Sequence, residues 1–172
     1  LPRGQVRLTP SALARVRILI DAGLNDYGAA ETGRLVRRAG GLEDRLALAR
    51  LLTSAADFHT AQRIVVEAYE LALARGPIPG REEVWQLAWP FAYADFVDGA
   101  TRAPDSVAPT LVYSIMREES GYRPRVISPV GARGLLQIMR ETGARLAARL
   151  GREGFHPDEL FDPQTNIELG ST

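Results

Sequence analysis

The sequence contains no cysteine, no surplus of either charge and no long apolar run. Its 172 residues carry 21 Lys and Arg against 21 Asp and Glu. The lack of cysteine excludes disulfides, thiolate zinc sites and cysteine nucleophiles. Balanced charge leaves no cationic surplus to neutralise a phosphate backbone, so we expect no nucleic-acid partner. A bilayer-spanning helix needs roughly 20 consecutive apolar residues, and without such a run we expect no transmembrane segment.

The remaining composition is that of an ordinary globular protein. Hydrophobic residues make up 45% of the chain and charged residues 24%, which argues against disorder. The length suffices for one large domain or two small ones with a buried core. The start of the chain has no apolar signal core. This absence proves little, because a chain that begins with Leu rather than Met is expected to be processed or cut from a longer one.

Apolar residues recur at helical spacing through the first half of the chain. One pattern begins at Ser11, with Pro10 ahead of it and Gly23 behind it as start and stop signals. Breaker residues separate it from further patterns around 35–36, 42–52 and 61–73. Strand patterns that alternate apolar and polar residues are missing. The sequence therefore predicts an all-α fold that starts with stacked, solenoid-like helical hairpins.

Two segments rich in breakers, 77–80 and 99–109, flank an interruption of the helical pattern at Trp89-Pro90. We predict a domain boundary near Trp89, which gives a helical domain over 1–88 and a second domain over 89–172. A boundary within 99–109 is the alternative.

The run after Pro109 is typical of a helix that ends at Gly121. Its apolar positions share one face: Leu111, Val112, Ile115 and Met116. At about 100° per residue, Glu119 falls at the centre of this stripe and Glu118 falls well away from it. We therefore expect Glu119 in the core or in an apolar cleft. A carboxyl removed from water favours its neutral form and can donate a proton to a departing oxygen.

A structural role for Glu119 is the alternative, either at the domain rim or paired with an arginine such as Arg133. A second polar segment follows, in which Ser128 opens a turn and two glycines precede a predicted helical stretch that contains Gln137. Hydroxyl and amide groups suit the hydroxyl and acetamido groups of a sugar.

Together these elements resemble the lytic transglycosylase domain of the soluble-transglycosylase family, whose members have a lysozyme-like fold. The resemblance lies in four segments in the family's order: Trp89–Tyr93, Glu119-Ser120-Gly121, Gly134–Gln137 and Pro163–Gly170. It covers about the last half of the chain and implies part of a lysozyme-like catalytic domain behind a helical linker.

The resemblance also implies the site. Glu119 matches the family's catalytic acid, and the expected substrate-binding residues are Ser120, Ser128, Gln137 and Met139. Such an enzyme cleaves the bond between N-acetylmuramic acid and N-acetylglucosamine in a peptidoglycan glycan strand. One glutamate serves as acid and then as base, the product is a 1,6-anhydro sugar, and no metal or cofactor takes part. The implied substrate places the protein in the periplasm or cell envelope.

The sequence departs from the family pattern at three points. Leu136 replaces a Met, which conserves volume, and Arg140 replaces a Pro, which can shift a helix start and adds positive charge near the cleft. The chain also stops at Thr172, before the segment that builds the other wall of the family's site. If the chain is complete, we expect a weak or inactive catalyst.

Two rival functions remain open. The chain could be a helical interaction module whose second half only binds glycan. It could also be a hydrolase of the lysozyme or chitinase type, which needs a second carboxylate, and the nearest candidates are Asp158, Glu159 and Asp162. A zinc site is not expected, because His59 and His156 lie far apart in sequence and lack partners at metal-ligand spacing; solvent-facing or capping roles are expected for both.

Overall fold

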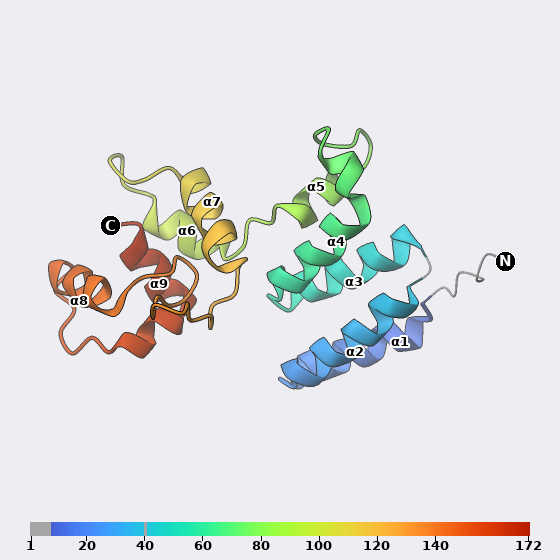
Figure 1. Ribbon diagram of the computed structural model, residues 1–172, viewed down its shortest axis with the longest axis horizontal. Coiled ribbons are helices and arrows are strands. Elements are labelled where there is room, and N and C mark those ends of the chain that lie inside the picture. Colours follow the sequence, from blue (N-terminus) through green and yellow to red (C-terminus); the bar gives the residue numbers. More distant parts are fainter. Residues whose placement is uncertain (1–7, 40) are drawn as a thin grey trace. The chain divides into compact units, whose positions relative to one another are not determined.

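The computed structural model describes residues 8–39 and 41–172, and within these ranges it contains helices and no β-strand (Figure 1). The elements in chain order are α1 (Pro10–Asp21), α2 (Asn25–Arg38), α3 (Leu42–Ser54), α4 (Phe58–Leu73), α5 (Glu82–Ala88), α6 (Ala94–Ala100), α7 (Pro109–Ser120), α8 (Arg140–Arg149), the 3₁₀ helix η1 (Pro157–Phe161) and α9 (Pro163–Gly170). The predicted all-α fold is confirmed.

The chain divides into two compact units, Leu1–Pro90 and Phe91–Thr172. The division falls just after Trp89-Pro90, where the helical pattern of the sequence is interrupted. Trp89 itself ends α5 as its C-cap residue, and its ring packs against Trp85 with 4.2 Å between ring centroids.

The first unit consists of helices that pack on their neighbours in sequence: α1 on α2, α3 on α4, and α4 on α5. Thr9 caps α1 by accepting a hydrogen bond from the Ala12 N–H at 3.3 Å, and Asp57 caps α4 in the same way. The core is formed by apolar side chains that recur at helical spacing, among them Val16, Leu35, Leu46, Leu48, Leu52, Ile64, Val65 and Val84. These short-loop pairs are the helical hairpins that the sequence predicts.

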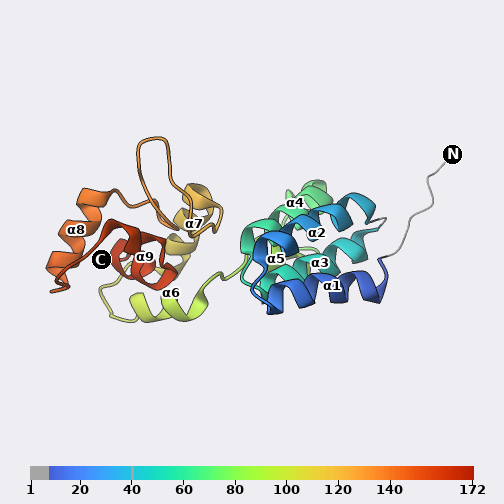
Figure 2. The ribbon, with the colours of Figure 1, turned by 90° about the horizontal axis from the view of Figure 1, so that it is seen from below.

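The second unit contains α6 to α9 and η1 (Figure 2). Helix α9 packs on α6, α8 and η1, and α7 packs on α6. One buried cluster joins α8, η1 and α9 through Ala147, Leu160, Leu169 and Ile138. None of the helices described in either unit combines the length and apolar character that crossing a bilayer requires.

The segment between α7 and α8 has no helix and is organised by two reversals of the backbone. Arg133 forms isolated β-bridges with Ile127 on one side and with Ile138 on the other. Gln137 lies within the second reversal, and α8 begins at Arg140. The predicted helical stretch containing Gln137 is therefore wrong: this residue takes a left-handed backbone conformation, with φ of 48°, that a helix cannot hold.

Candidate active site

Helix α7 carries Glu119 in its last turn. Pro109 occupies the first turn, where its missing N–H has no helical partner to lose, and Gly121 ends the helix in a left-handed conformation with φ of 56°. Both ends were predicted from these two residues. Glu119 therefore sits at a fixed position between the body of the helix and the backbone reversal that follows it.

The apolar stripe of α7 divides into two rows of residues spaced four apart. One row is buried in the protein: Val112, Met116 and Ser120. The neighbouring row is exposed: Leu111, Ile115 and Glu119. Of the two expected settings for Glu119, the core or an apolar cleft, the core is wrong, because the row to which it belongs faces outward beside the buried one. Leu111 and Ile115 are 50% and 38% exposed although both are apolar.

The exposed row forms one wall of an apolar groove with a volume of about 340 Å³. Leu111 and Ile115 line it from α7, and Glu119 continues the same row one helical turn further on. Thr142 and Leu146 line it from α8. The groove receives its remaining lining from Val107, Val112, Leu136, Gln137, Ile138, Met139 and Gly170. The open groove thus lies along the row of α7 that ends at Glu119, although Glu119 itself does not line it.

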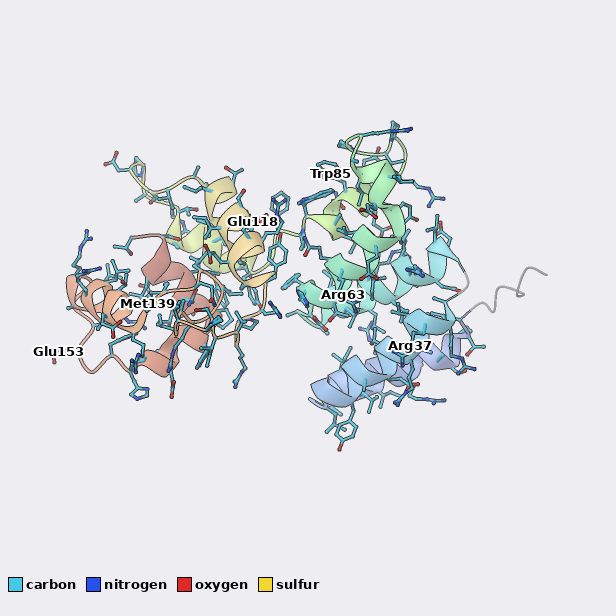
Figure 3. All side chains as sticks on the ribbon, viewed as in Figure 1. Arg37, Arg63, Trp85, Glu118, Met139 and Glu153 are labelled. Carbon is cyan, nitrogen blue, oxygen red and sulfur yellow. The ribbon has the colours of Figure 1, made fainter. Side chains whose placement is uncertain are left out.

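The two neighbouring glutamates differ in their surroundings. Glu118, labelled in Figure 3, forms an ion pair with Arg117 at 2.7 Å. Within the described part of the chain, no ion pair or hydrogen bond engages the Glu119 carboxyl. Arg133, the alternative partner of Glu119, forms an ion pair with Asp158 instead. The Arg133 guanidinium also lies 5.2 Å from the centre of the Phe161 ring. The carboxyl of Glu119 is therefore free to meet a ligand.

Gln137 projects into the groove from the turn formed by residues 133–138. Its side-chain N–H group donates to the carbonyl oxygen of Gly134 at 2.9 Å and to that of Val126 at 3.4 Å. These bonds use the donor end of the amide, so the amide oxygen is the end that a ligand can approach. Because Gln137 is half-buried and lines the groove, that oxygen can accept a hydrogen bond from a sugar hydroxyl or amide.

Of the other three predicted binding residues, Met139 lines the groove, whereas the hydroxyls of Ser128 and Ser120 form hydrogen bonds within the chain. Met139, also labelled in Figure 3, lines the groove and is the N-cap of α8. Ser128 closes its own turn, since its hydroxyl accepts a hydrogen bond from the Ala132 N–H at 3.0 Å. Ser120 is fully buried and donates to the Met116 carbonyl oxygen at 2.9 Å. As placed, Ser120 has no exposed surface with which to contact a substrate, and its hydroxyl bonds within the last turn of α7.

Tyr122 is a buried residue near the site that the sequence did not single out. It directly follows Gly121, has φ of 64°, and its ring is buried. Burial raises the pKa of Tyr122 to about 12, against a smaller opposing effect of Arg117. The chain thus leaves α7 through two consecutive residues in the left-handed region.

Each of the three candidates for a second catalytic carboxylate has a structural role. Asp158 pairs with Arg133. Glu159 accepts a hydrogen bond from the His156 backbone N–H at 2.6 Å and completes a capping box at η1. Asp162 caps α9 by accepting from the Thr165 N–H at 2.9 Å. These engagements argue against a hydrolase with two carboxylates.

The histidines do not point to a metal. His156 caps η1 through its ring, as expected of a capping residue, and its Nδ1 accepts from the Asp158 N–H at 3.3 Å. Over the residues that the structure describes, no three His, Cys, Asp or Glu side chains are grouped so that they could hold a metal ion.

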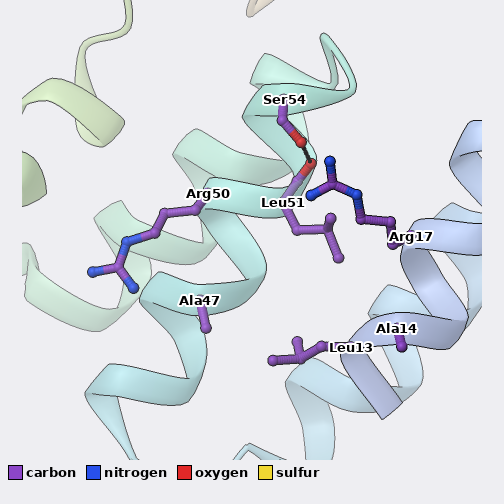
Figure 4. Close-up of a pocket in the computed structure, with 7 residues that line it drawn as sticks. All are labelled: Leu13, Ala14, Arg17, Ala47, Arg50, Leu51 and Ser54. Carbon is purple, nitrogen blue, oxygen red and sulfur yellow. Dashed lines mark hydrogen bonds between the residues drawn. The ribbon is translucent and has the colours of Figure 1, made fainter. Parts of the chain in front are cut away.

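A second pocket lies in the first unit, between α1 and α3, with a volume of about 320 Å³ (Figure 4). Apolar side chains line most of it, and its cationic residues are committed elsewhere: Arg50 pairs with Glu83, and Arg17 pairs with Asp21 at 3.6 Å. The lining contains no carboxyl group. The groove beside Glu119 is therefore the stronger candidate for catalysis.

The second unit is all-α and places an unpaired glutamate beside an apolar groove, as expected of a lysozyme-like catalytic domain. Comparison with known proteins agrees, because residues 99–172 match the transglycosylase SLT domain family. The soluble lytic murein transglycosylase of Salmonella typhimurium is 36% identical over 85 residues, which cover 49% of this chain and 13% of that protein. A putative soluble lytic murein transglycosylase of Haemophilus influenzae is 29% identical over 128 residues, or 71% of this chain and 21% of that protein.

The fold is also similar to that of a solved structure. The 70-kDa soluble lytic transglycosylase of Escherichia coli superposes with a TM-score of 0.68 and 28% sequence identity, over 92% of this chain and 24% of the larger one. The comparisons thus support an SLT domain of the soluble lytic transglycosylase type at residues 99–172. It spans only about an eighth to a quarter of the length of the relatives it matches.

Sequence reasoning missed one polar groove residue. Thr142 lines the groove from the first turn of α8. Thr142 follows Met139 by three residues, and both line the groove. This spacing indicates a shared face only if a helix begins at Arg140, which the sequence did not show.

Proposed function

We propose that this chain carries the acid-bearing part of a peptidoglycan lytic transglycosylase and that Glu119 is its general acid and base. One observation carries the proposal: Glu119 is exposed, has no partner among the described residues, and continues the row of α7 that lines the apolar groove. The substrate is the bond between N-acetylmuramic acid and N-acetylglucosamine, by analogy with relatives that are named for murein.

In the proposed reaction, protonated Glu119 gives its proton to the bridging oxygen as the bond from that oxygen to the muramic acid C1 breaks. The 6-hydroxyl of the same muramic acid then bonds to C1, and its proton passes to the Glu119 carboxylate. Glu119 thus regains from the 6-hydroxyl the proton that it gave to the leaving oxygen, so its protonated form is restored without water. This cycle needs one carboxyl, which agrees with the structural roles found for Asp158, Glu159 and Asp162.

The groove suits an amphipathic ligand such as an N-acetylated sugar. Apolar side chains from α7 and α8 can contact the faces of the sugar ring and the acetyl methyl group. The Gln137 amide oxygen and the Thr142 hydroxyl provide polar contacts that orient it. A sugar bound in the groove would also exclude water from the reacting groups.

Glu119→Gln tests this proposal, with Glu118→Gln as the matched control on the next residue of α7. Both variants remove one carboxylate from the end of the same helix, but Glu118 is paired with Arg117. Purified sacculi are incubated with each protein and the soluble products are identified by mass spectrometry. We expect anhydromuropeptides from the parent and from Glu118→Gln. We expect at least a hundredfold less from Glu119→Gln, roughly the smallest contribution of a general acid.

Three results would contradict the proposal. Equal release by parent and Glu119→Gln would show that another group is the acid. Products with a free reducing end would show that water attacks, as in a hydrolase. Binding of the folded parent to sacculi without any soluble product would favour a glycan-binding module instead of an enzyme. A location in the periplasm or cell envelope follows from the proposed substrate.

A further inference from the structure

The turn that presents Gln137 is held from a distant part of the chain by Asn166 on α9. The Asn166 side-chain N–H groups donate to the carbonyl oxygen of Arg133 at 3.0 Å and to that of Leu160 at 2.8 Å. Its side-chain oxygen accepts from the Leu136 N–H at 2.8 Å. Asn166 therefore bonds to the turn both at its start and one residue before Gln137. Both donors and the acceptor of this one amide are in use.

The surroundings of Asn166 make these bonds hard to replace. The residue is 0% exposed, so water cannot take the place of the lost amide. Gly134 packs so closely that a Cβ there would lie 2.1 Å from the Leu160 carbonyl oxygen and 2.3 Å from the Asn166 side-chain nitrogen. The turn and α9 are thus in direct contact, with the amide of Asn166 between them.

The turn itself is in a conformation that requires support. Gln137 has φ of 48°, which a residue with a side chain adopts rarely and at a cost. Within the turn, Arg133 and Ile138 exchange two backbone hydrogen bonds of 3.0 Å. The contacts from Asn166 add to these bonds on the side away from solvent, and together they keep Gln137 where it lines the groove.

We propose that Asn166 is a positioning residue, whose buried side chain clamps the turn of residues 133–138 and so holds Gln137 in the groove. This inference rests on the proposed function, because it gives the turn a role in glycan binding. Asn166 does not contact the substrate and takes no part in proton transfer. Its loss should weaken glycan binding through the relaxed position of Gln137.

The test compares Asn166→Asp with Asp162→Ala, both on the background of Glu119→Gln so that bound glycan is not cleaved. Asn166→Asp keeps the side-chain volume and the acceptor for the Leu136 N–H but loses both donors. Asp162→Ala removes the cap of α9 without touching the turn, so it controls for simple destabilisation. Asn166→Ser is a milder second variant should the first fail to fold.

Two quantities are measured for each protein: the dissociation constant for a soluble oligosaccharide of alternating N-acetylglucosamine and N-acetylmuramic acid, and amide hydrogen exchange over residues 91–172. We expect Asn166→Asp to lose exchange protection selectively at Gln137 and Ile138. We also expect it to bind about tenfold more weakly than the control, the scale of one well-formed contact. Asn166→Ser should change both quantities in the same direction.

Uniform loss of protection in the Asn166 variants, or affinity equal to that of Asp162→Ala, would overturn the inference. Failure of the parent to bind the oligosaccharide at all would instead contradict the proposed function. In that case the exchange pattern alone still decides whether Asn166 fixes the turn.

Discussion

Gly134→Ala should destabilise the second unit far more than an alanine at a neighbouring glycine of similar backbone conformation. Gly134 has φ of 76°, and its Cβ would lie 2.1 Å from the Leu160 carbonyl oxygen. Gly131 has φ of 90°, and its Cβ would meet nothing within 4 Å. Both substitutions impose a left-handed conformation on alanine, at a cost of about 1–2 kcal/mol. The difference between them isolates the steric contact.

The additional cost at Gly134 can be worked from what the new methyl group displaces. Neither the Leu160 carbonyl nor the Asn166 amide can keep its position, so the three hydrogen bonds made by Asn166 lengthen or break. At about 0.5–1.5 kcal/mol net for each of the three bonds, the contact adds about 1.5–4.5 kcal/mol. We therefore expect about 2.5–6.5 kcal/mol of destabilisation for Gly134→Ala and about 1–2 kcal/mol for Gly131→Ala.

The assay is chemical denaturation, with the unfolding of residues 91–172 followed separately by hydrogen exchange at core amides of this unit. Separate detection matters because the chain has two compact units, whose unfolding need not coincide. Equal destabilisation by the two substitutions would refute the reasoning. It would mean that the left-handed backbone conformation accounts for the whole loss of stability at Gly134, and that the contacts with Leu160 and Asn166 add nothing.

Two other predictions concern residues outside the site. The raised pKa of Tyr122, about 12, means that the folded chain holds this phenol proton after the unfolded chain releases it near pH 10. The corresponding stability is fully present below about pH 10 and is lost as the pH rises toward 12, and Tyr122→Phe should make this fall shallower in denaturation curves measured across that range. Because the sequence contains no lysine, lysine titration does not obscure the effect. Leu48→Ala, at a fully buried position, should cost the first unit about 2–5 kcal/mol and leave the unfolding of residues 91–172 unchanged, as seen by hydrogen exchange. Leu71→Ala on the same unit, where the side chain is 84% exposed, should cost less than about 0.5 kcal/mol; a similar cost at both positions would contradict the assigned core.

The helices were predictable because their signals are local. Pro10 and Pro109 begin helices in the structure, Gly121 ends one, and the apolar periodicity between such signals matches α1, α3, α4 and α7. Each of these features depends on a few residues adjacent in sequence. For the same reason, the sequence could place Glu119 on the row of Leu111 and Ile115.

The predictions that failed each depended on a contact between distant residues. Gln137 was expected in a helix, but its turn is held by Asn166, which lies 29 positions later. The structural alternative for Glu119, a pairing with Arg133, also does not hold, because Arg133 pairs with Asp158. Ser120 was expected to bind substrate, whereas its row of α7 is the buried one. None of these contacts leaves a periodic signal in the sequence.

The sequence by itself determined the all-α fold, the ends of α7 and the side of that helix on which Glu119 lies, because backbone conformation and helical periodicity fix these locally. Tertiary structure alone decided that the row of Glu119 faces an open groove while the adjacent row is buried. Helical periodicity defines a stripe wide enough for both rows. Which row is covered depends on the helices and turns that pack against α7, and these come from parts of the chain far away in sequence.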